Sequence, residues 1–176
     1  MAYWNTRGLR GSAFEEMVDL TNQLYAQKEL AIIQKVPTPI TPVAVDNKSR
    51  TITSAYFEKK STIDFIGVAQ GIPICFDAKE TREKNLPLKN IHAHQIEFMQ
   101  SFRKQQGISF ILVHFQAKNE VFLLPIEELS QHHQNAQNGG RKSIPYECFK
   151  YAVPNKNGFP VHYLVAINKY MEEISP

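Results

Sequence analysis

The sequence predicts one α/β domain. Short apolar and β-branched runs, which are typical of buried strands, alternate with segments in which apolar residues recur at helical spacing. The chain has 176 residues, which is enough for one compact domain with a core of its own. It contains no internal repeat and no linker long enough to separate two units. We therefore expect residues 1–176 to form a single domain.

Composition narrows the functional classes. The net charge of +3 permits nucleic-acid binding without requiring it. The longest apolar run, residues 108–115, is far shorter than the roughly 20 residues of a transmembrane helix. Residues 1–10 lack the apolar centre of a secretory signal, and the two cysteines, Cys75 and Cys148, have no metal-type spacing. We expect a cytoplasmic protein with reduced thiols and no membrane partner.

The first expected element is a helix that begins at Ser12. Ser12 and Glu15 have the Ser-x-x-Glu spacing of a capping box. Apolar residues at helical spacing continue to Leu24, and the helix closes near residues 27–29. In this interpretation Glu15 is a capping residue and needs no catalytic role.

A proline-rich hairpin is expected next. Residues 31–36 form a β-like run, and the prolines at positions 37, 39 and 42 exclude a central strand because proline lacks a backbone N–H. Residues 43–45 and 50–56, joined by a polar turn, predict two paired strands with polar side chains on both faces. We expect this hairpin to project from the body as a stalk over about residues 35–57.

The remaining elements follow from the same patterns, with glycines marking a turn and a helix end. We expect buried strands at 63–69 and 72–78, a helix at 92–105, and paired strands at 108–115 and 121–125. A short helix opens at 125–129, followed by an exposed polar loop at 131–140 and a second loop at 154–159. A helix at 161–171 closes the chain, although its first half could instead be a strand.

Two carboxylates and a lysine are the candidate catalytic residues. Asp77 and Lys79 alternate onto one face at the end of a buried strand, and a turn at Gly71 can bring Asp64 close to Asp77. An Asp-x-Lys tripeptide alone is common on solvated strands, but two converging acids suit a hard cation such as Mg²⁺, for which Mn²⁺ can substitute. A cation there neutralises a phosphodiester and activates water, while the lysine supports the transition state. Asp-x₁₂-Asp-x-Lys has the form of the PD-(D/E)xK nuclease core.

Several further motifs occur in order along most of the chain, residues 10–144, and the joint run around Asp77 to Gln95 is highly specific. With them, the sequence resembles the RecU family of Holliday-junction resolvases. The resemblance is carried above all by Ser61-Thr-Ile-Asp64-Phe-Ile-Gly67, by Phe76-Asp-Ala-Lys-Glu-Thr81, and by Pro87-Leu-Lys-Asn-Ile-His92-x-His94-Gln95.

The resemblance implies a restriction-endonuclease-like core, in which helices flank a mixed central sheet and the hairpin stalk enters the centre of a junction. It implies a homodimer that nicks four-way junction DNA symmetrically with Mg²⁺ during recombination and repair. A recombinase or a branch-migration helicase is a further expected partner, and the expected location is the nucleoid. Two departures stand out: Asp77 occupies a position where the family usually has glutamate, and the basic N-terminal extension of the family is nearly absent.

The resemblance also implies roles for individual residues. Lys79 is the residue that stabilises the transition state, and Glu15 is an acidic residue on the first helix close to the active site. The implied metal ligands are Thr62, Asp64, Asp77 and Gln95. Other interpretations stay open: Thr62 could be an ordinary strand residue, and Gln95 a surface helix residue. His92 and His94 lie two positions apart, so they do not share a helix face and we expect no zinc site.

Basic residues around the stalk and after Gly140 are candidates for phosphate contacts, which position DNA without reading its sequence. The alternative is ordinary surface charge. The candidates are Arg10, Lys35, Lys48, Arg50, Lys59, Lys60, Arg141 and Lys142.

The residues leave two alternatives to a junction resolvase. One is a different PD-(D/E)xK enzyme, of the repair or restriction type, that acts on linear duplex. The other is a protein that binds junctions or modulates a recombinase without cleaving DNA.

Overall fold

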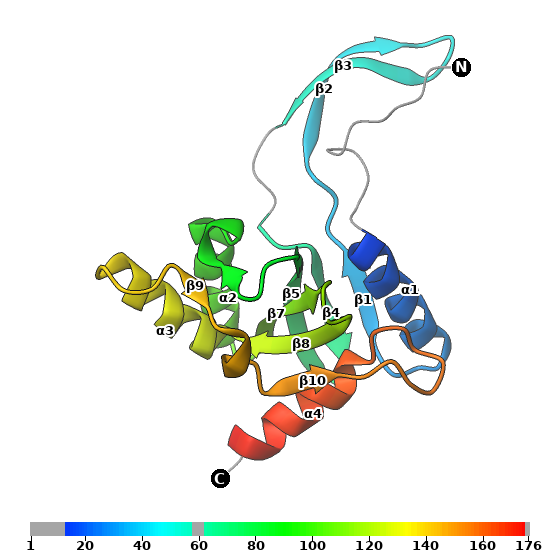
Figure 1. Ribbon diagram of the computed structural model, residues 1–176. Coiled ribbons are helices and arrows are strands. Elements are labelled where there is room, and N and C mark those ends of the chain that lie inside the picture. Colours follow the sequence, from blue (N-terminus) through cyan, green and yellow to red (C-terminus); the bar gives the residue numbers. More distant parts are fainter. Residues whose placement is uncertain (1–12, 58–61, 175–176) are drawn as a thin grey trace.

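A computed structural model describes residues 13–57 and 62–174 and shows a mixed α/β fold with four α-helices and a projecting hairpin (Figure 1). No helix in these two ranges combines the length and the apolar character needed to cross a membrane. The elements in chain order are α1 (Ala13–Gln27), β1 (Ile32–Lys35), β2 (Ile40–Asp46), β3 (Thr51–Phe57), β4 (Phe65–Ala69), β5 (Ile72–Thr81), β6 (Leu86–Pro87), the 3₁₀ helix η1 (Leu88–Asn90), α2 (Ala93–Lys104), β7 (Ile108–Phe115), β8 (Glu120–Pro125), α3 (Ile126–Gln137), β9 (Ser143–Ile144), the 3₁₀ helix η2 (Tyr146–Cys148), β10 (Tyr151–Val153) and α4 (Tyr163–Ile174).

Six strands form the central sheet, in the order β1-β4-β5-β7-β8-β10. Strands β5 and β7 run parallel, whereas the other neighbouring pairs are antiparallel. A parallel pair needs a long crossover, and the segment from β6 through α2 supplies it. The predicted α/β class, with a mixed central sheet flanked by helices, is confirmed.

Helices cover both faces of the sheet. One core contains residues of α1 and α4 and includes the stacked rings of Phe65, Phe76 and Phe110, whose neighbouring centroids lie 4.9 and 4.8 Å apart. The other core contains residues of α2 and α3 together with Cys75, which is a free thiol, as is the half-buried Cys148. Alternation along β5 turns Phe76 toward α1 and α4, so Asp77 points to the face that α2 covers.

The hairpin of β2 and β3 rises away from the sheet, as predicted (Figure 1). Its strands pair only with each other among the described strands, and a register shift follows Pro42. Proline is tolerated there because β2 has no partner strand on its other side. The carboxylate of Asp46 orders the turn by accepting hydrogen bonds from the backbone N–H of Lys48 and the hydroxyl of Ser49, at 2.9 and 2.6 Å.

One expectation for the C-terminal half was wrong. The segment expected as an exposed loop at 131–140 is helical up to Gln137, because α3 continues well past residue 129. Leu129 is buried and Ala136 packs against the second core, so this polar segment still has an apolar face. Gly139, with a φ of 86°, follows the helix end. Strand β10 was not expected, whereas the closing helix is confirmed as α4.

Candidate active site

Asp64 and Asp77 are brought together by the antiparallel pairing of β4 and β5. This pairing sets Phe65 opposite Phe76, and Asp64 directly precedes β4. The carboxylate of Asp77 accepts a hydrogen bond from the backbone N–H of Asp64 at 2.8 Å. The carboxylate of Asp64 accepts one from the N–H of Ala78 at 2.9 Å. The predicted convergence of the two carboxylates is therefore present.

Lys79 lies on the same face as Asp77 and forms an ion pair with it. Its Nζ is 2.8 Å from Oδ2 of Asp77, a side chain that is fully buried. No described group donates a hydrogen bond of good geometry to that oxygen. A buried carboxylate oxygen without a hydrogen-bond donor is costly unless a cation faces it. The Oδ2 atom thus fits a position that a metal ion could share with the lysine.

The charges at this site are unbalanced. Burial and, secondly, the negative charge of Asp77 together raise the pKa of Asp64 to about 6, although Lys79 acts in the opposite direction. Among the described residues, the ammonium group of Lys79 thus faces two carboxylates in a poorly solvated place. A divalent cation would relieve this repulsion.

Gln95 is buried at the start of α2, on the face of the sheet that carries Asp77. Its Oε1 atom accepts a hydrogen bond from the backbone N–H of His92 at 3.2 Å, so Gln95 helps to cap its own helix. The interpretation of Gln95 as a surface residue is therefore wrong. Thr62, at the edge of the described chain, is exposed two residues before Asp64.

The donor set suits a magnesium-type ion. The described residues contain no cluster of three or more His, Cys, Asp or Glu side chains that could hold a metal. The rings of His92 and His94 stack at 5.5 Å, because His92 precedes the helix, but they gather no further ligand of this kind within the described ranges. Two carboxylates with amide, hydroxyl and water oxygens fit Mg²⁺, which keeps several waters when bound to proteins. The residues present therefore fit the expected metal.

Glu15, on the first turn of α1, forms an ion pair with Lys35 at the end of β1, at 2.9 Å. The negative charge of Glu15 also contributes to the raised pKa of Asp64. Hydrogen bonding to Glu15 is the main cause of a raised pKa for Lys35, and the charge of Asp64 adds to it. Glu15 and Lys35 are therefore close enough to interact electrostatically with Asp64, one of the two carboxylates. Ser12, the expected cap for Glu15, lies outside the described residues.

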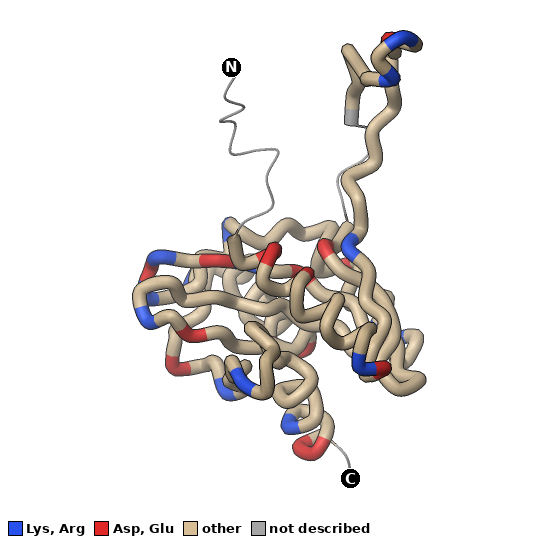
Figure 2. The backbone as a smooth tube through the Cα atoms, turned by 90° about the vertical axis from the view of Figure 1, so that its right-hand side faces the viewer, with Lys and Arg blue, Asp and Glu red and all other residues tan. Residues whose placement is uncertain are grey.

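The other basic candidates lie at separate places. Lys48 and Arg50 are exposed at the tip of the hairpin, and Figure 2 shows basic positions at both the tip and the base of the hairpin. Arg141 and Lys142 are exposed between α3 and β9, where the Nε of Arg141 donates a hydrogen bond to Ser143 at 3.2 Å. Arg10, Lys59 and Lys60 lie outside the described residues.

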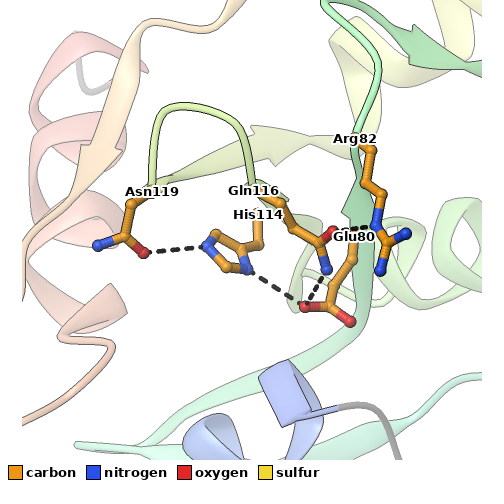
Figure 3. A network of polar contacts seen from close by, with 5 residues as sticks. All are labelled: Glu80, Arg82, His114, Gln116 and Asn119. Carbon is orange, nitrogen blue, oxygen red and sulfur yellow. Dashed lines mark hydrogen bonds and ion pairs between the residues drawn. The ribbon is translucent and has the colours of Figure 1, made fainter.

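A polar network that no sequence pattern predicted joins the ends of β5 and β7 (Figure 3). Oε1 of Glu80 accepts a hydrogen bond from Gln116 at 3.1 Å and lies 3.2 Å from Nδ1 of His114. Arg82 donates to Gln116 at 3.0 Å, and the ring of His114 lies 5.2 Å from that of Phe14 in α1. Glu80 follows Lys79 and points to the other face, so the network anchors the strand that carries the site.

Known proteins resemble this chain over most of its length. The family model described as Recombination protein U matches residues 9–169. A protein named Holliday junction resolvase RecU from Streptococcus agalactiae is 45% identical over 154 residues, which cover 85% of this chain and 74% of the relative. Its namesake from Leuconostoc mesenteroides is 41% identical over 174 residues, covering 95% and 84%.

A solved structure of Hjc from Archaeoglobus fulgidus, described as a Holliday junction resolvase, also matches. It has 15% sequence identity and a TM-score of 0.41, and the match covers 66% of this chain and 78% of that one. The family model and the relatives above 40% identity are sufficient on their own: the chain belongs to the Recombination protein U (RecU) family.

Proposed function

We propose that this protein is a structure-selective endodeoxyribonuclease that resolves Holliday junctions in recombination and repair. The observation that carries the proposal is the arrangement of Asp64, Asp77 and Lys79, in which the buried carboxylate of Asp77 and the half-buried carboxylate of Asp64 converge beside the ammonium group of Lys79. This chemistry suits hydrolysis of a phosphodiester. Relatives that are 41–45% identical are named Holliday junction resolvases, which supports a junction as the substrate.

Asp64 and Asp77 would hold Mg²⁺, or Mn²⁺ in its place, with oxygens of Thr62 and Gln95 completing the protein ligands. The ion, when bound, supplies charge neutralisation and an acidified water molecule. The ammonium group of Lys79, 2.8 Å from Oδ2 of Asp77, would orient a water molecule and stabilise the negative charge that develops on the phosphate. Glu15 pairs with Lys35 and adds negative charge near Asp64, so we propose that it favours the protonated form of Asp64.

Selection of a junction would rest on shape and charge. The hairpin projects from the sheet (Figure 1), and we propose that it enters the open centre of a four-way junction. We propose phosphate contacts for Lys35, Lys48 and Arg50 in the hairpin and at its base, and for Arg141 and Lys142 before β9. The same proposal extends to Arg10, Lys59 and Lys60, which lie outside the described residues.

Paired symmetric nicks need two matching sites, which a homodimer would supply. We propose that the protein acts at the nucleoid, where recombination intermediates form, with a recombinase or a branch-migration helicase as a further partner.

The deciding experiment is cleavage of a labelled, mobile four-way junction beside linear duplex of the same sequence, in Mg²⁺ and in Mn²⁺. Wild type, Asp77→Ala and a control, Glu172→Ala on the exposed side of α4, are compared. Paired nicks in the junction alone, lost only in Asp77→Ala, are expected. Equal cutting of linear duplex would instead indicate a repair or restriction-type nuclease. Tight junction binding without nicking in either metal would indicate a non-cleaving junction-binding protein.

A further inference from the structure

A groove separates the short β6–β9 pair from the C-terminal half of α3. Strands β6 and β9 pair antiparallel with Pro87 opposite Ser143, and the N–H of Leu88 donates a hydrogen bond to the carbonyl of Lys142 at 3.0 Å. The groove has a volume of about 540 Å³, and its walls include Leu88, Lys89, His133, Lys142 and Ser143. It lies on the surface next to the second core, away from the carboxylate pair itself.

The groove contains two lysines that form no ion pair within the described part of the chain. Lys89 directly follows Leu88, so the hydrogen bond to Lys142 holds the two lysines as neighbours across the strand pair. Both are exposed, and neither forms an ion pair with any residue that the structure describes. Glu83 also lines the groove, whereas the nearby Lys84 pairs with Glu147 at 3.7 Å. With Lys89 and Lys142 against the single described acidic residue Glu83, the groove wall has an excess of positive charge, which favours an anionic ligand.

A second hollow continues this surface beyond Ser143, which lines both. Its volume is also about 540 Å³, and its walls include Arg141, His132, Asn135 and Asn138. No acidic residue is among its described lining residues. Three cationic side chains and several amide side chains thus lie in succession along the surface. A linear polyanion needs such a row of contacts, whereas a single phosphate ion does not.

The position of this surface connects it to the candidate active site. Lys89 lies three residues before His92, the residue that caps α2, and six before the buried Gln95. In Figure 1, α2, α3 and β9 lie on one side of the central strands and the hairpin rises on the other. A duplex that passes over Asp77 beside the hairpin would therefore continue toward the groove.

We propose that Lys89, Lys142 and Arg141 form a phosphate-binding track for one duplex arm of the DNA substrate. The track rests on the proposed function, because it assumes that DNA reaches the nearby carboxylates. It binds the sugar–phosphate backbone and so positions the arm without reading base sequence. It is a separate surface from the hairpin, which faces the junction centre.

The test measures binding of a linear duplex, without divalent metal, over a range of salt concentrations. The variant Lys89→Ala/Lys142→Ala is compared with wild type and with Lys156→Ala/Lys169→Ala, a control that removes the same charge from exposed positions near α4. Loss of two phosphate contacts lowers the slope of log affinity against log salt by about 2 and the affinity by about 10- to 100-fold at roughly 0.1 M salt. Lys89→Arg/Lys142→Arg is expected to restore the slope.

The track is overturned if the Lys89→Ala/Lys142→Ala variant keeps the wild-type slope, or if the control variant loses as much. Nicking of a junction by wild-type protein in Mg²⁺ is measured separately. If the variant has a reduced slope but the wild-type protein does not nick the junction, the track is supported and the proposed activity is contradicted. Nicking with an unchanged slope would contradict the track alone.

Discussion

The carboxylate of Asp77 accepts a hydrogen bond from the backbone N–H of Asp64, at 2.8 Å. The side chain of Asp64 in turn accepts one from Ala78 at 2.9 Å. Each carboxylate is therefore fixed to the backbone of the neighbouring strand by one oxygen, which leaves its second oxygen for other partners. Because strands hold these groups, the geometry exists before any ligand arrives, as a preorganised site requires.

The first prediction concerns pH and metal. Burial, and secondly the charge of Asp77, raise the pKa of Asp64 from 3.8 to about 6, so the folded chain holds this proton more tightly than the unfolded chain does. The resulting stability is complete below about pH 4 and is lost as the pH rises through about 6. Mg²⁺ needs the ionised form. We expect Mg²⁺ to raise the melting temperature more at about pH 8 than at about pH 5, measured against EDTA at each pH.

The control for that experiment is Asp64→Asn/Asp77→Asn, in which Mg²⁺ should have little effect on the melting temperature at either pH. An equal metal-induced rise at both pH values in wild type would contradict a metal site that includes Asp64.

The second prediction concerns the close approach of β1 to Gly67. A Cβ atom at this position would lie 2.0 Å from the carbonyl oxygen of Ile32 and 2.7 Å from the Cα of Ile33, both backbone atoms. Gly67→Ala must therefore displace β1, the strand that leads into the hairpin. We expect a loss of about 2–3 kcal/mol in the free energy of unfolding by urea. The exposed neighbour Val68 gives the control: Val68→Ala should cost less than about 1 kcal/mol, and equal losses would refute the argument.

The third prediction concerns the network of Glu80. Removing its carboxylate leaves His114 and Gln116 without their shared acceptor in a half-buried place. Glu80→Ala should lower the unfolding free energy by about 1–2 kcal/mol, and Glu80→Gln, which keeps an acceptor oxygen, by less. Denaturant unfolding measures both. The exposed Glu172→Ala is the control, and a network without structural importance would give the same small change in all three variants.

Local patterns predicted much of the site and of the fold. The convergence of Asp64 and Asp77 follows from one hairpin and from alternation along a strand. Both features can be predicted from residues that are close together in the sequence. The projecting hairpin was predictable for a similar reason, since prolines and a polar turn exclude it from the central sheet.

Contacts between distant segments were not predictable in this way. The ion pair of Glu15 and Lys35 joins a helix to an edge strand 20 residues away, and Glu80 meets His114 across 34 residues. Such contacts depend on the order of strands in the sheet, which no single segment encodes. The length of α3 was missed because its apolar residues are few, and only packing on the second core shows that they suffice.

The last prediction separates the role of Lys79 from that of the metal. Lys79→Ala removes the ammonium group that pairs with the fully buried carboxylate of Asp77, and the Lys79 side chain is itself only 16% exposed. We expect the metal-free variant to lose about 2–4 kcal/mol of unfolding free energy, less than the full cost of breaking a completely buried ion pair. Mg²⁺ should restore part of this loss, because a cation then faces both carboxylates again.

Nicking of a four-way junction by Lys79→Ala should nevertheless fall by about 100- to 1000-fold even at saturating Mg²⁺, because the group that stabilises charge on the phosphate is missing. Metal-dependent melting and nicking are measured on the same preparation, with the exposed Lys169→Ala as the control. A variant that neither nicks nor responds to Mg²⁺ would mean that the lysine is needed to build the metal site. One that nicks at the wild-type rate would mean that the ion pair with Asp77 serves stability alone.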